Sequence, residues 1–259
     1  MSNWEFTLVG KKPKLKNPIL IEGLPGIGNV GKIVVDFLIE QLKPKKIYDI
    51  FSPSFPHSVF VNEKNLVELP SIEMYYLDIN KRSFLLLTGD VQPTDEVNSY
   101  EFVEKVLDVV SELGCKEIIT IGGIGLQQPP KKPRIFCTGN NAAFIRKYKG
   151  SADNRLYGVV GPIIGASGLL LGLGQKRKIN AMALLAETFV HPMYLGVDGA
   201  QEVLKILDNN FRFKIDLKKL TKELKEVKTE LKKISDLGEV SKQTAMKKAE
   251  KVRQISYIG

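Results

Sequence analysis

Apolar residues along the chain follow two patterns: short continuous runs, which are typical of buried strands, and a spacing of three or four, which is typical of helices. The predicted strands are residues 19–24, 46–50, 58–61, 72–78, 83–88, 115–123, 135–140 and 181–187. The predicted helices are residues 32–42, 95–113, 141–148, 165–173 and 198–211. Apolar strands that alternate with helices indicate a sheet covered on both faces. We therefore predict an α/β core domain over residues 1–208, a three-layer fold with a largely parallel sheet.

The C-terminal part has a different pattern. An apolar seam recurs with spacings of 3, 4, 3, 4 and 3 at Leu217, Leu220, Leu224, Val227, Leu231 and Ile234. Two apolar positions in every seven are typical of a coiled coil, in which one helix packs on another. Gly238 interrupts the seam, and a more polar helical stretch covers 240–255. We predict a C-terminal helical extension with a flexible tail over residues 209–259. The seam is interpreted as an oligomer contact, and a hairpin that folds back on its own domain is the alternative.

The positive charge is uneven. The chain carries 38 Lys and Arg against 29 Asp and Glu, a net charge of +9. From residue 208 onward there are 14 basic and 8 acidic residues, a net of +6, and the remaining 24 and 21 give +3. The tail has only Phe211, Phe213 and Tyr257 as aromatics, and it lacks a nucleic-acid reader motif. Nucleic acid is therefore an unfavoured partner.

Cysteine and histidine are too few for a structural metal site. Cys115 and Cys137 are not in a metal-binding spacing, and His57 and His191 complete the set, so we predict no metal. No apolar run approaches the roughly 20 residues that span a bilayer, and no export signal is visible near the start. The prediction is a cytoplasmic protein with no membrane partner.

A glycine-rich loop follows the first predicted strand, in the stretch ILIEGLPGIGNVGK. Its glycines are Gly23, Gly26, Gly28 and Gly31. One reading is a dinucleotide fingerprint, for which Asp49 is the candidate acid after the second strand. Another is a phosphate loop ending at Lys32, but Ile33 replaces the Ser or Thr that binds magnesium. We favour a structural loop that packs a helix closely on the sheet, with no cofactor.

Further glycine clusters follow other strands, in IGGIG (121–125) and GPIIGASGLLLGLG (161–174). Glycine-rich turns at strand ends build the crevice in which α/β enzymes often bind ligands, and they also let helices lie close to a sheet. Ser167 is not in a nucleophile elbow, because Leu169 stands where the pattern needs Gly. A triad of Ser167, His191 and Glu187 is imaginable, but no catalytic residues are predicted.

Taken together, these segments resemble the archaeal proteasome assembly chaperone family. The resemblance is carried by EGLPGIGNVGKIVVDFLIEQL, GGIG, GPIIGASGLLLGLG and ALLAETFVHPMYLGVDGAQEVLKIL, and it covers about residues 16–208. It implies a nucleoside phosphorylase-like core that forms homo-oligomers and has no established catalytic activity. It also implies a partner, because some members bind the seven-membered α-ring of the proteasome core particle as assembly factors or as ATP-independent activators.

The resemblance also implies a docking tail. Ring-binding members use a C-terminal hydrophobic–Tyr–any tripeptide, whose Tyr ring and carboxylate enter pockets between α subunits. Here the chain ends in QISYIG, so Tyr257 is third from the end rather than penultimate. Ile255, Tyr257, Ile258 and the Gly259 carboxylate are the candidate anchor, and a frayed helix end is the alternative. Repetition of such a tail in an oligomer converts weak contacts into avidity.

Two other functions stay open at this point. One is a small-molecule enzyme of phosphorylase or hydrolase type, working in the glycine-rich crevice near 26–32 and 122–125. The other is a structural protein that assembles through its seam with a homologous partner, as a hetero-oligomer.

Overall fold

An eight-stranded sheet forms the centre of the protein in the computed structural model, which describes residues 3–62, 64–158, 161–191 and 194–220. The strands are β1 (Glu5–Leu8), β2 (Ile19–Glu22), β3 (Lys45–Phe51), β6 (Ile72–Ile79), β7 (Arg82–Gly89), β8 (Glu117–Leu126), β9 (Ile135–Gly139) and β10 (Asn180–Phe189). Their order in the sheet is β1-β3-β6-β7-β2-β8-β10-β9. The four central strands β7, β2, β8 and β10 run parallel, and the pairs outside them are antiparallel.

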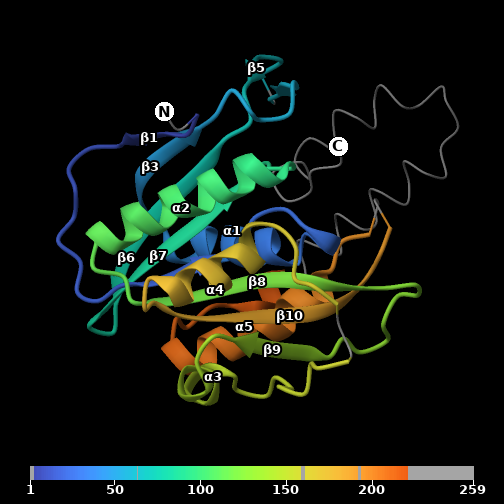
Figure 1. Ribbon diagram of the computed structural model, residues 1–259. Coiled ribbons are helices and arrows are strands. Elements are labelled where there is room, and N and C mark those ends of the chain that lie inside the picture. The colour runs from blue at the N-terminus through green and yellow to red at the C-terminus, as the bar shows by residue number, and fades with distance from the viewer. Residues whose placement is uncertain (1–2, 63, 159–160, 192–193, 221–259) are drawn as a thin grey trace, which may run out of the picture.

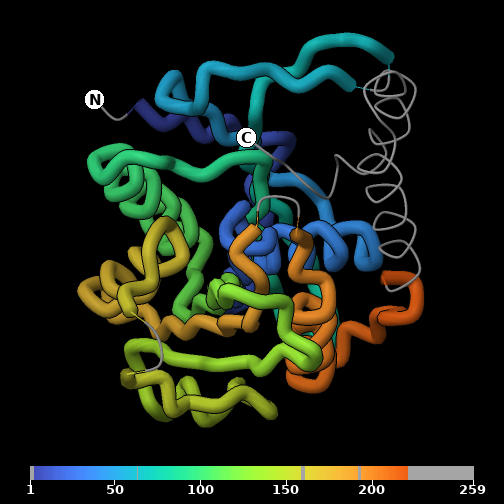
Figure 2. Tube along the Cα trace, turned by 90° about the vertical axis from the view of Figure 1, so that its right-hand side faces the viewer, coloured from blue at the N-terminus to red at the C-terminus, as the bar shows by residue number. Residues whose placement is uncertain are grey.

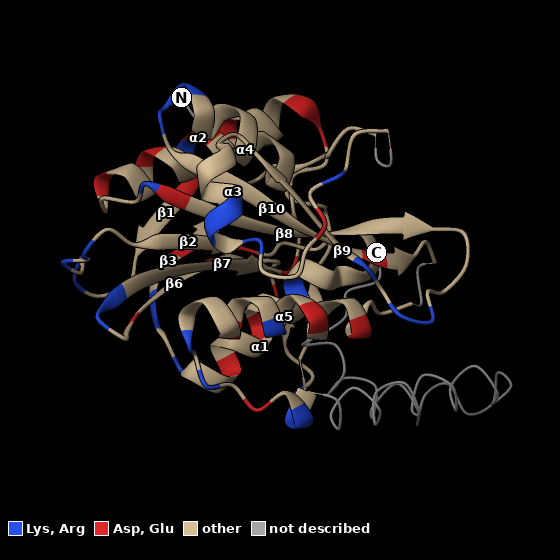
Figure 3. Ribbon diagram, turned by 90° about the horizontal axis from the view of Figure 1, so that it is seen from below, with Lys and Arg blue, Asp and Glu red and all other residues tan. Residues whose placement is uncertain are grey.

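Helices cover both faces of this sheet, which confirms the predicted three-layer α/β fold (Figures 1 and 3). The helices are α1 (Val30–Leu42), α2 (Glu96–Glu112), α3 (Ala142–Tyr148), α4 (Ala166–Lys176) and α5 (Val197–Phe211), with a 3-10 turn η1 (Ile27–Asn29) before α1. α2 and α4 lie on one face, and α1 and α5 lie on the other. Helices α1 to α5 agree with the predicted helices 32–42, 95–113, 141–148, 165–173 and 198–211 to within three residues at either end.

Continuous apolar strands are explained by burial on both faces. In β10, alternate residues enter the two separate cores of the molecule. The core under α1 and α5 takes Met182, Leu184 and Ala186, and the core under α2 and α4 takes Ala181, Ala183 and Leu185. A strand with one solvent-facing side would instead alternate apolar with polar residues.

Local chemistry fixes the ends of several elements. β6 and β7 form the predicted hairpin, and its two-residue turn holds Asn80 at φ 52° and Lys81 at φ 62°, the left-handed conformation that such turns require. The side chain of Asp95 accepts a hydrogen bond from the Asn98 backbone N–H at 2.9 Å and so caps the start of α2.

Three details differ from the sequence-based picture. β1 was not predicted, because its four residues lie at an edge of the sheet and are mostly exposed. The predicted strand 58–61 is reduced to β4 (Phe60–Val61), which pairs only with β5 (Val67–Glu68) in a separate hairpin beyond the β1–β3 end of the sheet (Figures 1 and 2). The predicted domain boundary at residue 208 lies inside α5, and Phe211, Phe213 and Leu220 are buried in the core.

The corner between β2 and α1 is one of the tightest contacts of the fold. A Cβ added to Gly23 would lie 2.1 Å from the Gly31 carbonyl oxygen, whereas a Cβ added to Gly26 would meet no atom within 4 Å. Gly26 has φ −163°, which any residue can adopt. We therefore expect Gly23→Ala to lower the free energy of unfolding by about 2–4 kcal/mol.

The matched control for this prediction is Gly26→Ala. It should leave the free energy of unfolding unchanged or raise it by up to about 1 kcal/mol, since it only restricts the unfolded chain. Urea denaturation followed by circular dichroism measures both values. Equal effects at the two positions would contradict the packing role of Gly23.

Candidate functional site

The glycine-rich loop brings main chains into contact. Beyond the contact of Gly23 with Gly31, a Cβ on Gly31 would lie 2.4 Å from the Ile121 carbonyl oxygen of β8. Gly28 has φ 65°, and a Cβ there would lie 2.2 Å from the hydroxyl oxygen of Thr188. Close packing thus accounts for three of the four glycines. Gly26 has no such neighbour, because it faces a cavity.

Lys32, the candidate phosphate ligand, is held by the fold. Its side chain is 6% exposed, and its Nζ lies 3.0 Å from both the Gly89 carbonyl oxygen and a carboxylate oxygen of Asp36. Asp90 lies 3.8 Å away. Burial raises the pKa of the Asp36 carboxyl, and the neighbouring Lys32 ammonium opposes that shift. A phosphate could reach Lys32 only by breaking these interactions.

Asp49, the candidate acid of a dinucleotide fingerprint, lies far from the loop in the sheet. It belongs to β3, which β6 and β7 separate from β2. A fingerprint requires the acid at the end of a strand beside the first one. Asp49 instead pairs with Lys46 on its own strand, at 2.8 Å. The topology therefore does not assemble a dinucleotide site from these residues.

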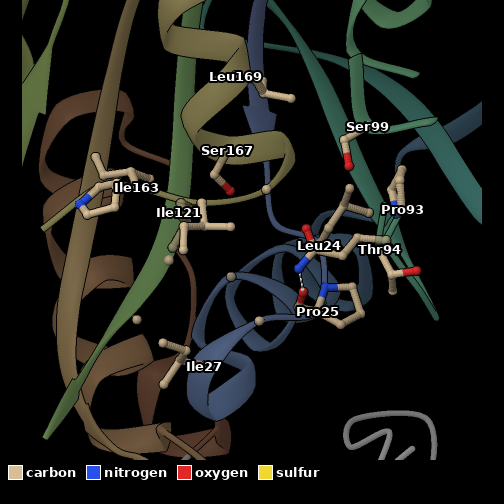
Figure 4. Close-up of a pocket in the computed structure, with 18 of the residues that line it drawn as sticks. Leu24, Pro25, Ile27, Pro93, Thr94, Ser99, Ile121, Ile163, Ser167 and Leu169 are labelled. Atoms are coloured by element: carbon tan, nitrogen blue, oxygen red, sulfur yellow. Dashed lines mark hydrogen bonds between the residues drawn. The ribbon is translucent and has the colours of Figure 1, made fainter. Parts of the chain in front are cut away.

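A crevice of about 720 Å³ opens at the carboxyl ends of β2, β7 and β8 (Figure 4). Apolar side chains dominate its wall, among them Leu24, Ile27, Ile121, Ile163 and Leu169. This is the edge at which parallel α/β sheets usually bind ligands.

The charged residues that line the crevice restrict the class of ligand that can bind there. Within the described part of the chain, no Lys, Arg or His lines it, whereas Asp95 and Glu96 do. Hydrogen bonds from Asn98 lower the pKa of Asp95 and keep that carboxylate ionised. An anion entering the crevice would meet acidic groups and no cation, so the crevice suits an apolar or uncharged group rather than a nucleotide.

A buried carboxyl lies behind the crevice. Glu22, at the end of β2, is fully buried and accepts hydrogen bonds from the Leu24 backbone N–H at 3.0 Å and from the Ser167 hydroxyl at 2.8 Å. Ser167 lines the crevice from the first turn of α4. Burial raises the pKa of Glu22 to about 7, and the two hydrogen bonds limit that rise. The sequence offered no signal for this pair, whose members are 145 residues apart.

The imagined triad does not assemble. Ser167 contacts Glu22, whereas Glu187 accepts hydrogen bonds from the Arg134 guanidinium and from its backbone N–H at 2.9 Å. The His191 ring stacks on Phe189, with centroids 5.4 Å apart. The described residues therefore do not bring this serine, histidine and carboxylate together.

The cysteines are structural in character. Cys115 and Cys137 are both buried and free, and burial raises the pKa of the Cys115 thiol to about 11. Among the described residues there is no group of three or more His, Cys, Asp or Glu that could hold a metal ion. No helix in the described ranges is long and apolar enough to cross a membrane.

The predicted seam is only partly described. Leu220 is 2% exposed and packs in the core under α1 and α5, and the partly buried Leu217 packs against the same core. Leu224, Val227, Leu231 and Ile234 lie outside the described residues, as do the candidate anchor residues Ile255, Tyr257, Ile258 and Gly259. The first turn of the seam therefore packs within its own chain, and the rest stays a prediction.

The raised pKa of Glu22 predicts a pH dependence of stability. The folded-state pKa of Glu22, about 7, lies above the ordinary value of 4.5. The stability that the protonated carboxyl contributes is therefore fully present below pH 4.5 and is lost as the pH rises through 7. Glu22→Gln removes that loss. We expect the stability of the variant relative to the wild type to improve by on the order of 3 kcal/mol between pH 4.5 and pH 8.

Urea denaturation of both proteins across this pH range measures the difference between their free energies of unfolding. The titration of all other groups contributes equally to both proteins and cancels in this difference. Ser167→Ala is the companion variant. Removing its hydrogen bond to the carboxylate should move the titration of Glu22 to higher pH, because that bond favours the charged form. A pH-independent difference between Glu22→Gln and the wild type would show that Glu22 is already ionised in the folded protein.

Known proteins share this fold along nearly the whole chain. The model of the PAC2 family matches residues 20–235. The crystal structure of Pyrococcus furiosus PbaB, described as an archaeal proteasome activator, is 34% identical with a TM-score of 0.81, over 91% of this chain and 100% of PbaB. P. furiosus PbaA, described as an archaeal homolog of proteasome-assembly chaperone, is 20% identical with a TM-score of 0.74, over 96% and 99%.

A curated protein from Methanocaldococcus jannaschii, named only as uncharacterized, is 28% identical over 246 residues, which cover 95% of this chain and 93% of that protein. The similarity to PbaA shows a shared fold. The similarity to PbaB and the match to the family model show a relationship in sequence as well. The chain therefore belongs to the PAC2 family, and its homologues include an archaeal proteasome activator.

Proposed function

We propose that this protein is a non-enzymatic, ATP-independent activator of the proteasome that binds the α-ring of the core particle. The observation that carries the proposal is the likeness to PbaB, which is 34% identical and is matched over its full length. Identity to PbaA is 20%, so activation is favoured over assembly as the main role. We place this function in the cytoplasm.

The docking element in this proposal is the end of the chain. Ile255, Tyr257, Ile258 and the Gly259 carboxylate would enter pockets between adjacent α subunits, with the tyrosine ring as the anchor. Residues 208–259 carry a net charge of +6, which would speed encounter with an acidic ring surface. The shift of Tyr257 to third from the end means that the ring and the carboxylate are spaced differently from the usual tripeptide.

The geometry of the crevice agrees with a non-enzymatic role. Lys32 is engaged with Asp36 and Gly89, and Ser167 contacts a buried carboxyl rather than a histidine. These groups act within the fold, and nothing about them favours the phosphorylase or hydrolase alternative.

Oligomerisation would multiply the tails. In the proposal, Leu224, Val227, Leu231 and Ile234 form the contact between subunits, after Leu217 and Leu220 have anchored the start of the helix on the core. Several weak tails on one oligomer would then bind the ring with avidity. A homologous chain could supply the partner helix in place of a second copy.

Replacement of the tail tyrosine tests the docking. Tyr257→Ala, or deletion of residues 256–259, should weaken binding to the core particle by about thirtyfold or more, because a buried aromatic anchor commonly contributes 2 kcal/mol or more. Surface plasmon resonance on immobilised core particles measures binding, and hydrolysis of a fluorogenic peptide measures activation.

The control is Tyr157→Ala, because the Tyr157 side chain is fully exposed on the core domain, at 105%. It should leave both readouts unchanged. Binding that survives the deletion would refute docking through the tail, whatever the effect on peptide hydrolysis.

The mass of the protein in solution tests whether the seam forms the contact between subunits. Leu224→Ser together with Leu231→Ser should convert the oligomer to a monomer of 28.9 kDa, measured by multi-angle light scattering. Lys225→Ser with Lys232→Ser, which changes neighbouring residues outside the seam, should keep the oligomer. An unchanged mass for the leucine variant would mean that the seam packs within its own chain.

A further inference from the structure

A second cavity lies at the opposite end of the sheet from the crevice. Its volume is about 540 Å³, and its charged and polar side chains come from Lys16, Asn17, Lys81, Arg82, Lys116, Glu117 and Asn180. These residues precede or begin β2, β7, β8 and β10, the four parallel neighbours at the centre of the sheet. Because parallel strands start at the same edge, the register of the sheet itself brings these residues around one cavity.

Positive charge dominates this basic pocket. Four cationic side chains line it against one carboxylate, that of Glu117. That carboxylate is already surrounded: Lys147 Nζ lies 3.0 Å from it, the Tyr148 hydroxyl donates to it at 3.1 Å, and Arg82 lies 3.9 Å away. Its charge is therefore countered without help from the three lysines.

The lysines have no acidic partner in the described part of the chain. No described carboxylate lies within 4.0 Å of the ammonium groups of Lys16, Lys81 or Lys116, and all three side chains are exposed. Asp78, an acidic residue near the cavity, accepts a hydrogen bond from the Ser83 hydroxyl at 2.5 Å. Like charges gathered in one cavity repel each other, and a bound anion would remove that repulsion.

The pocket also offers an amide donor and a guanidinium that is held in place. The Asn141 side-chain amide donates to the Asn180 side-chain oxygen at 3.0 Å, which leaves the Asn180 NH₂ as the group that can face the pocket. The Arg82 guanidinium donates to the Tyr148 hydroxyl at 2.8 Å and is thereby held in place. A fixed guanidinium beside several ammonium groups is the donor set that phosphate oxygens bind.

Cations are also favoured near the C-termini of helices, where carbonyl groups carry partial negative charge. α2 ends at Glu112, shortly before Lys116. That role would explain one lysine beside one helix end. It does not explain why Lys16 and Lys81, which follow no helix, line the same cavity.

We propose that the basic pocket binds a small phosphate-type polyanion, which carries at least two adjacent negative charges. The ammonium groups of Lys16, Lys81 and Lys116 and the guanidinium of Arg82 would supply the charge. This site is separate from the crevice, which lies at the other edge of the sheet, and it does not depend on the proteasome proposal.

Titration calorimetry of the full-length protein with inorganic pyrophosphate, in low-salt buffer, tests the site. Lys16→Glu with Lys116→Glu should lower the affinity at least about tenfold, because two cations beside the anion become anions. The matched control is Lys131→Glu with Lys132→Glu. This pair makes the same change in net charge on the exposed loop after β8, at the other edge of the sheet.

Binding by the wild type and the control, with the loss confined to the Lys16/Lys116 variant, would support the site. No binding by the wild type, or an equal loss in both double variants, would overturn it. Lys81→Gln replaces one lysine of an exposed turn by an uncharged residue and gives a milder test if the double variant does not fold. It should weaken binding several-fold. Tripolyphosphate and ATP, compared in parallel, distinguish a phosphate site from one that also reads a nucleoside.

Discussion

Direct contact between main chains at the corner of β2 and α1 is the constraint on which the rest of the structure depends. Gly23 lies against Gly31, and Gly31 lies against the Ile121 carbonyl of β8, with no room for a Cβ at either contact. A side chain at either position would push α1 away from the sheet. The contact buries the first turns of α1, and with them Ile33 and Val34. It also places Lys32 at the end of β7, where the Lys32 ammonium donates a hydrogen bond to the Gly89 carbonyl oxygen.

That constraint explains why buried charges at this edge serve the fold. A lysine carried under the helix needs a counter-ion, and Asp36, one turn further along α1, supplies it at 3.0 Å. Glu22 lies on the other side of the same corner, held by the Leu24 backbone and by Ser167. Each of these groups has its partners inside the protein. Lys32 and Ser167, two of the candidate functional residues in the sequence, therefore already have partners at this corner.

The parts of this fold that the sequence predicts are those in which one local pattern repeats. Strong apolar spacing predicts α2 and α5, and an Asn-Lys turn between two apolar runs predicts the β6–β7 hairpin. β1 has four residues and little buried surface, so it depends on pairing with β3 rather than on its own pattern. The structural interpretation of the glycine loop could be favoured from the sequence because Ile33 replaces the Ser or Thr of a phosphate loop. That Asp49 lies too far away for a dinucleotide site is visible only in the order of the strands. By contrast, the Glu22–Ser167 pair and the basic pocket arise from residues far apart in the chain, which no local pattern connects.

The two edges of the sheet differ in charge for a reason that lies in the topology. At the carboxyl edge, the strands lead into loops and helix starts, and the residues of these that line the crevice include Asp95 and Glu96 but no Lys, Arg or His. At the amino edge, helices end and short turns lead into strands, and the residues just before β2, β7 and β8 include Lys16, Lys81 and Lys116. The core outside the C-terminal part has a net charge of +3, and the basic pocket, with four cations and one carboxylate, carries the same +3, so the other residues of that part are neutral in sum. The rim of the crevice carries Asp95 and Glu96 and the basic pocket carries four cations, so the contrast in charge lies between these two cavities.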